Sequence, residues 1–523
     1  MRFPDPPRRT LAISAMTLLI LLATGCSVVP AYRKPDATIP AQWMTPSEMP
    51  GAAGTTGAAG TTATPAAAAA AATALPPSVV ARVFWSGFGS PQLDALLQYG
   101  LVSGPDVAIA RARLEQAKGA ADVAGSSASP TLGIGADLSR GSTSGKRSTS
   151  VTFQAGFTPD LWGALDAKTQ SAGEGARASE FDLVSVQRNL LSQIAAQYFA
   201  VRACEERLRL AQQVADDASR LLGLVERQAS LGAASALDVA QQRNAVQTLQ
   251  AAIPALRQQR VAAVAQLAVL VDVPPVMLKL DGEPLLQLTV PDVVAVSPAD
   301  VVDARPEVQA AEARLRAANF DVGAARAAFL PSLSITASAG WLLNPTAAAW
   351  GVAGSLLQPL FDGGQRKGQL RIENGKSAEI LASYRQTLLQ VLQQTETQLA
   401  AVAQLKEQER FDAAAVESAQ ESLRLARIRY ERGASDLLAV LLSQKTLAQA
   451  QDTLVQVRQQ RLQAAAALFV ATGGRTLPVD TPSTASARPD PQIADASHVS
   501  DATITANSIR AFDAGRPLQG VAP

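Results

Sequence analysis

The stretch ERGASDLLAVLLSQ, at residues 431–444, decides the fold because the same chain carries it twice in variant form. Residues 230–241 read SLGAASALDVAQ, and an offset of 201 residues places Gly232 on Gly433. The offset also superimposes distant landmarks without a gap, namely Pro105 on Pro306, Pro130 on Pro331, Gly163 on Gly364, and RQQR at 257–260 on RQQR at 458–461. Chance similarity between alanine-rich helices would not place prolines, glycines and a tetrapeptide in one register, so the chain is a tandem duplication.

The overall composition excludes several classes of function. The chain has 523 residues, of which 47% are apolar, so it is long and apolar enough for a large core. Its 46 basic residues balance 45 acidic ones, and this near-zero net charge gives no indication of nucleic-acid binding. One histidine, His498, and two cysteines, Cys26 and Cys204, provide no zinc spacing, no disulfide framework and no catalytic constellation. The sequence therefore predicts no enzyme activity, no cofactor and no metal site.

The first 25 residues have the composition of a signal peptide. Two arginines precede an apolar run at residues 11–23, which is too short to span a bilayer comfortably. The run leads through the tripeptide ATG to Cys26, which resembles a bacterial lipobox and predicts cleavage before Cys26 and lipidation of its thiol. Ser27, in place of aspartate, favours sorting to the outer membrane. The alternative is an ordinary signal peptide with an incidental cysteine.

Changes in composition divide the rest of the chain into segments. A lipid-anchored segment with a Gly/Ala/Thr/Pro-rich linker is followed by two repeats, a connector between them and a polar tail that is expected to be partly disordered. The predicted boundaries are 26–83 for the anchored segment, 84–280 for the first repeat, 281–300 for the connector, 301–474 for the second repeat and 475–523 for the tail.

Each repeat contains two short segments in which apolar residues alternate with small or polar ones. They predict β-hairpins at about 130–160 and about 331–361. Such alternation is typical of strands in a transmembrane β-barrel, although a soluble hairpin with one face on a core is the alternative. Four strands cannot close a barrel alone, and open edges are not tolerated in hydrocarbon, so several chains must pool their strands.

Long helical patterns follow each hairpin. Apolar or small residues recur about every 3.5 residues across 183–225 and 381–430, which predicts coiled-coil packing. A helix between Gly163 and Leu231 would run roughly 100 Å. Gly232 and Gly433 are expected to terminate these helices, and Ser235 and Asp436 to cap the helices that return. The repeated phrase is therefore predicted to be the turn at the tip of a long helical hairpin, made twice.

Four stretches carry a resemblance to a known family. They are FWSGFGSPQLDALL at 84–97, ARPEVQAAEARLRAANFDVGAARAAFLPSLSITAS at 304–338, PLFDGGQRKG at 359–368 and the tip phrase at 430–444. Together with the duplication, they resemble the TolC-type outer-membrane factor family, in particular its NodT-like and OprM-like lipoprotein efflux branch. The resemblance covers about 84–474, most of the mature chain.

This resemblance implies a mixed, mainly α-helical fold in a homotrimer. Three chains would form a twelve-stranded β-barrel in the outer-membrane lipid of a Gram-negative bacterium, continued by an α-helical barrel across the periplasm. A periplasmic adaptor protein and an inner-membrane pump of the RND type would deliver small molecules to this passive exit duct. Two alternatives are an exit duct for type I protein secretion and, in another class, a non-conducting structural lipoprotein.

The resemblance also implies a gate near the second tip. Candidates for it are Tyr430 and two carboxylates, Asp436 and Asp238, because a ring of such carboxylates on three chains would favour cations. Relatives often carry an aspartate further along, where residues 439–443 here have none. Asp436 has a helix N-cap as its alternative role, and Asp238 a place on a solvated helix face.

Both turns expose small residues, which suggests that adaptor helices dock there. The expected docking residues are Leu231, Gly232, Ala233, Ser235, Gly433, Ala434 and Ser435.

Overall fold

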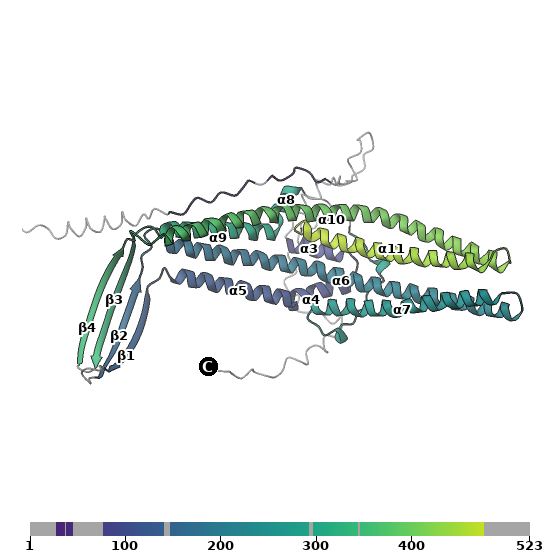
Figure 1. The fold of residues 1–523 in the computed structure, drawn as a ribbon, viewed down its shortest axis with the longest axis horizontal. Helices are drawn as coiled ribbons and strands as arrows, with labels where there is room; N and C mark the ends of the chain where they lie inside the picture. The colour runs from purple at the N-terminus through teal and green to yellow at the C-terminus, as the bar shows by residue number, and fades with distance from the viewer. Residues whose placement is uncertain are drawn as a thin grey trace, which may run out of the picture. The chain divides into compact units, whose positions relative to one another are not determined.

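The computed structural model describes residues 28–36, 38–44, 77–140, 147–291, 297–343 and 346–474. Cys26, the predicted signal peptide and the predicted tail lie outside these residues. The described elements, shown in Figure 1, follow in the order α3 (Pro77–Ser86), α4 (Pro91–Ser103), α5 (Pro105–Ser126), β1 (Thr131–Arg140), β2 (Arg147–Phe157), α6 (Ala164–Ser230), α7 (Ala236–Leu270), η1 (Pro275–Met277), η2 (Leu285–Gln287), α8 (Pro298–Ala304), α9 (Pro306–Ala327), β3 (Ser332–Leu343), β4 (Thr346–Leu357), α10 (Gln365–Glu431) and α11 (Leu437–Ala471).

The tandem duplication is visible in the element boundaries. Helices α6 and α10 have 67 residues each, α7 and α11 have 35 each, and α5 and α9 have 22 each. Each of these helices in the second repeat begins 201 residues after its counterpart in the first. The prediction of a mainly α-helical, internally duplicated chain with two pairs of strands is therefore confirmed.

Two long helices organise the packing of the others. Helix α6 packs against α5 and α7 on one side, and α9 and α11 pack against both α6 and α10. We call α6–α7 the first hairpin and α10–α11 the second hairpin. Within the described residues, no helix combines the length and hydropathy needed to cross a membrane.

The main core lies at the middle of α6. Phe84 of α3 and Phe88, just after α3, are fully buried there together with Tyr198 and Phe199 of α6. Phe84 stacks on Phe469 near the end of α11, with 4.1 Å between ring centroids. This cluster joins the start of the first repeat to the end of the second, and so fixes the two repeats to each other.

The four strands form one antiparallel sheet in the order β1-β2-β3-β4. The register aligns apolar residues across all four strands, and one such row consists of Ile134, Phe153, Ala339 and Trp350. Adjacent rows on the opposite face hold small or polar residues, because side chains alternate between the faces of a strand. The predicted alternation therefore extends over the whole sheet, with β1 and β4 as its edges.

The predicted lipid-anchored segment contains a described stretch before α3 that packs on the rest of the chain. In this stretch, residues 28–36 and 38–44, a Cβ atom on Gly323 would lie 2.7 Å from the Val29 side chain. Further along, the Arg316 guanidinium lies over the Tyr32 ring at 5.6 Å from its centroid. Both partners belong to α9, so this stretch is held by contacts far away in the sequence, which composition cannot indicate.

Candidate functional site

The first tip is the turn at residues 231–235, between α6 and α7. Gly232 has φ +76°, a conformation that glycine adopts without strain. The amide of Gly232 donates to the Ala229 carbonyl oxygen at 3.0 Å, and the amide of Ala233 to that of Gln228 at 2.8 Å. This pair of hydrogen bonds is a Schellman motif, which satisfies carbonyl groups that the end of a helix leaves unpaired.

The second tip, residues 432–436 between α10 and α11, repeats this geometry. Gly433 has φ +69°, and its amide donates to the Tyr430 carbonyl oxygen at 2.9 Å. The amide of Ala434 donates to the Arg429 carbonyl oxygen at 2.8 Å. The predicted glycine termination of both long helices is therefore confirmed.

The two tips differ in how the returning helix is capped. Ser235 and Asp238 form a capping box, in which the Asp238 amide donates to Ser235 Oγ at 3.1 Å and the Ser235 amide to Asp238 Oδ2 at 2.9 Å. At the second tip, Asp436 Oδ1 alone accepts from the Ala439 amide at 3.2 Å. The predicted capping roles of Ser235 and Asp436 are confirmed. Asp238 lies partly exposed in the first turn of α7, which is compatible with the solvated helix face considered for it and adds a capping role.

These hydrogen bonds stabilise the ionised form of Asp238. The Ser235 hydroxyl, followed by the Ser235 amide, holds the pKa of the Asp238 carboxyl below its ordinary value. The carboxyl is therefore ionised at neutral pH. One negative charge is thus held at the first turn of α7, where the helix dipole favours it.

Two contacts connect the first hairpin to the second near the tips. The Tyr430 hydroxyl donates to Gln228 Oε1 at 2.9 Å, and Arg427 Nη2 lies 3.7 Å from Asp217 Oδ2. Burial raises the pKa of Tyr430, and the Asp238 charge adds to the shift. The structure therefore brings two gate candidates, Tyr430 and Asp238, into one electrostatic environment. Sequence analysis did not identify Gln228, because only its place in the last turn of α6 marks it.

The small turn residues are mostly exposed at both tips, and exposed leucines surround them. Leu231, Gly232, Ala233, Ser235, Gly433 and Ala434 are exposed, while Ser435 is half-buried. At the tips, four leucines have more than half of their surface exposed, namely Leu231, Leu237, Leu438 and Leu442. The last three were missed as site residues, although the match of Leu237 with Leu438 in the repeated phrase was a signal for two of them.

The geometry at the tips can support binding and charge recognition. Among the described residues, no group of three or more His, Cys, Asp or Glu side chains is placed to hold a metal ion. Cys26, the predicted lipidation site, lies outside the described residues.

Comparisons with known proteins agree with this architecture. The family model described as outer membrane efflux protein matches residues 96–271 and 298–474. The pyoverdine export outer membrane protein OpmQ of Pseudomonas aeruginosa is 36% identical over 413 residues, which cover 75% of this chain and 87% of that protein. The antibiotic efflux pump outer membrane protein ArpC of Pseudomonas putida is 28% identical over 492 residues, or 89% of this chain and 96% of that protein.

A solved structure has the same fold. The outer membrane channel CmeC of Campylobacter jejuni superposes with a TM-score of 0.74 at 18% identity, covering 87% of this chain and 96% of that one. The family match spans both repeats and most of the described helices and strands. The chain therefore belongs to the outer membrane efflux protein family, whose members are transport channels, and it is an outer-membrane efflux channel.

Proposed function

We propose that three copies of this chain form one closed channel across the outer membrane. The proposal is supported by the four-stranded sheet. On one face of this sheet, the apolar residues that align across the strands are exposed. Among the residues that the structure describes, β1 and β4 have no further strand beside them. Unpaired edges are not tolerated in hydrocarbon, so β4 of one copy would pair with β1 of the next until the ring closes. Three copies give twelve strands, an even number above the minimum of eight.

The ordered N-terminal segment supports lipid attachment at Cys26. Val29 packs on Gly323, close to where α9 leads into β3. The segment that follows Cys26 therefore approaches the part of the chain from which the sheet starts. A diacylglyceryl group on Cys26 would then add a second membrane attachment to that of the sheet.

The tips are the proposed contact for a periplasmic adaptor protein. Exposed leucines beside small turn residues form an apolar surface with open space around it, which is typical of protein-binding sites. An inner-membrane pump of the RND type would complete the system. Because OpmQ is named for pyoverdine export and ArpC for antibiotic efflux, we infer that the cargo is a small molecule.

Tyr430, Asp238 and Asp436 are the proposed components of a gate that is closed at rest. Repetition around three copies would turn each carboxylate into a ring of negative charge, which attracts cations. The hydrogen bond from Tyr430 to Gln228 would hold the two hairpins together in the closed state.

Cross-linking between edge strands tests the trimer. Gly133 in β1 and Ser355 in β4 are changed to Cys in a Cys204→Ala background, and intact cells are treated with a short bismaleimide. Covalent trimers are expected only when both cysteines are present. The matched control places cysteines at Gln154 in β2 and Ser338 in β3, which are paired within one chain. If the edge pair gives only monomers while the channel is folded, the proposed pairing is wrong.

Photo-cross-linking at Leu438 tests the docking surface. A photoreactive residue there is expected to capture an adaptor protein in living cells. The control position is Leu389, which is also exposed but lies on α10 away from the tips. Capture of the same partner from both positions, or from Leu389 alone, would contradict docking at the tips.

A further inference from the structure

In each repeat, the returning helix of the hairpin ends beside the start of a shorter helix. The end of α11 lies beside the start of α9, where a Cβ atom on Gly473 would lie 2.8 Å from the Ala304 Cβ. The end of α7 lies beside the start of α5, where a Cβ on Gly104 would lie 3.3 Å from the Leu270 carbonyl oxygen. We call these places the second joint and the first joint. The long helix α6 passes the first joint, and α10 passes the second joint, without a break.

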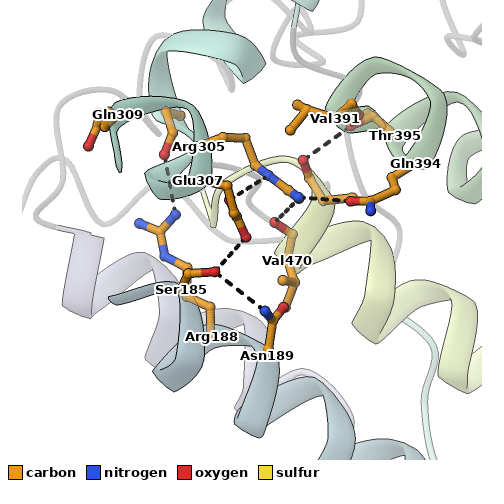
Figure 2. A network of polar contacts seen from close by, with 12 residues as sticks. Ser185, Arg188, Asn189, Arg305, Glu307, Gln309, Val391, Gln394, Thr395 and Val470 are labelled. Carbon is orange, nitrogen blue, oxygen red and sulfur yellow. Dashed lines mark hydrogen bonds and ion pairs between the residues drawn. The ribbon is translucent and has the colours of Figure 1, made fainter. Parts of the chain in front are cut away.

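A buried arginine occupies the second joint, as Figure 2 shows. Arg305, at the N-cap of α9, is 5% exposed. Its Nη1 donates to the Val470 carbonyl oxygen at 3.1 Å, and its Nη2 donates to Gln394 Oε1 at 2.9 Å. One planar guanidinium thus connects the start of α9 to the last turn of α11 and to the middle of α10. The guanidinium geometry fixes these directions, which a lysine ammonium would not.

Glu307 extends this network to the first repeat. Arg305 Nε lies 3.0 Å from Glu307 Oε2, in an ion pair that falls outside hydrogen-bond geometry. Glu307 Oε1 accepts from Ser185 Oγ of α6 at 2.7 Å. Thr395 Oγ1 of α10 donates to the Ala471 carbonyl oxygen at 3.2 Å. Helices α6, α9, α10 and α11 therefore meet in a single polar cluster.

The charges in this cluster follow the dipoles of the two helices that meet. The carboxyl end of α11 carries partial negative charge, and the Arg305 cation lies on it. The amino end of α9 carries partial positive charge, and Glu307 lies in its first turn. Burial lowers the pKa of Arg305, and the Glu307 charge opposes that shift. The ion pair and the carbonyl groups thus compensate for taking the guanidinium out of water.

The first joint has no such cluster at the corresponding place. The counterpart of Arg305 is Gly104, which has a similar extended backbone, φ −58° and ψ 128° against φ −80° and ψ 120°. A Cβ atom on Gly104 would collide with the Gly100 carbonyl oxygen and lie 2.7 Å from Leu190 Cδ2. The first joint is thus closed by tight apolar packing, whereas directional hydrogen bonds define the second.

We propose that Arg305 is a positioning residue that sets the resting direction of the second hairpin and thereby holds Tyr430 against Gln228. Helix α11 has 35 residues and is about 50 Å long, so a tilt of about 5° at the joint would move the tip by about 4 Å. That displacement exceeds what a hydrogen bond tolerates. This role rests on the proposed closed gate at the tips, and it deepens that proposal by placing a determinant of closure at the joint.

Single-channel recording of the purified full-length trimer in planar bilayers tests this role. Arg305→Gln removes the charge and is expected to raise the resting open probability by about tenfold, the shift produced by losing one hydrogen bond to a charged group. Arg305→Lys keeps the positive charge but lacks the planar guanidinium, and it is expected to give a smaller rise in the resting open probability. The matched control, Arg314→Gln, lies on the same helix in an exposed ion pair with Asp182 and should leave the resting state unchanged.

A second variant and a rescue keep the test decisive. If Arg305→Gln does not assemble, Thr395→Val is the second variant. It removes the hydroxyl that bonds the Ala471 carbonyl oxygen and, within α10, the Val391 carbonyl oxygen, and it should give a smaller rise in the same direction. Cysteines replacing Gln228 and Tyr430, joined by a short bismaleimide in a Cys204→Ala background, should return the Arg305→Gln trimer to the closed state. Persistence of the leak after this link would contradict action through the tips.

Tyr430→Ala separates failure of this proposal from failure of the gate. If Tyr430→Ala opens the trimer but neither Arg305→Gln nor Thr395→Val does, the gate stands and the positioning role is wrong. If none of the three variants opens it, the gate at the tips is wrong and the positioning role falls with it.

Discussion

Gly104 and Arg305 occupy one backbone position in two copies of the same repeat, yet they close their joints by opposite means. The first joint leaves no room for a side chain at Gly104, whereas the second joint is built around the guanidinium of Arg305. The helices that meet at the two joints have equal lengths, 22 residues for α5 and α9 and 35 for α7 and α11, and the two N-cap residues have similar dihedral angles. The duplication has therefore preserved the path of the chain, while the chemistry at a matched position was free to diverge.

The tips show the same divergence on a smaller scale. Both turns contain a Schellman motif around a glycine, but a reciprocal capping box closes only the first. Asp238 of that box corresponds to Ala439 in the second repeat. Backbone geometry is again shared, and the carboxylates are not.

The largest effect is expected at the second joint. Arg305→Leu should destabilise the protein by about 3 kcal/mol, because it leaves the half-buried Glu307 without its cation. Denaturant titration of the detergent-solubilised channel measures the change. The double variant Arg305→Leu with Glu307→Leu should recover part of the loss, since the unpaired carboxylate is also removed. A double variant that is less stable than the single one would show that Glu307 acts independently of Arg305.

The next largest effect tests the first joint. Gly104→Ala should cost about 2 kcal/mol, because the added methyl meets backbone oxygen that cannot easily move. The control is Gly119→Ala on α5, where nothing lies within 4 Å and alanine should stabilise by up to about 1 kcal/mol. The same denaturant titration compares them. Equal stabilities for the two variants would mean that the first joint is not tightly packed.

A smaller effect is expected for the cap of the second tip. Asp436→Ala should destabilise the start of α11 by about 1 kcal/mol, the usual value for an N-cap. Hydrogen exchange of the first turn of α11 reports this loss directly. Asp436→Asn keeps an oxygen that can accept the bond and should stay close to the original. If Asp436→Ala leaves exchange unchanged, the carboxylate is free for another role.

The smallest effect is a response to acid at the first tip. Asp238 has a lowered pKa, so its contribution to stability is complete above the ordinary value of 3.8 and is lost as the pH falls through the lower folded value. We expect the first turn of α7 to fray in that range, measured by hydrogen exchange corrected for the intrinsic rate. Asp238→Asn should abolish the pH dependence. Fraying that persists in this variant would assign it to another group.

Local signals in the sequence predicted much of this fold. Alternation along the chain identified the strands, the 3.5-residue period identified the long helices, and Gly232 and Gly433 marked the turns. Each of these signals resides in neighbouring residues, which determine backbone conformation directly. The fixed offset between the repeats then supplied the internal symmetry.

Features that depend on distant residues were not predicted. The pairing of β2 with β3 joins strands from different repeats, and the contacts of Tyr32 with α9 cross most of the chain. The ARPE motif was recognised as a family marker, but no periodicity shows that Arg305 reaches the end of α11. The sequence located the tips, whereas the hydrogen bond from Tyr430 to Gln228 depends on how the two hairpins pack.

The equal lengths of the paired helices restrict how such a protein can change during evolution. Removing seven residues from α10 alone would move the second tip by about 10 Å along the helix axis and separate Tyr430 from Gln228. The same deletion would also have to be made in α11, α6 and α7 for the turns to meet again. Longer or shorter forms therefore require four matched insertions or deletions in one gene, each a multiple of the heptad. Descendants of the duplication are thus expected to vary in sequence far more readily than in length.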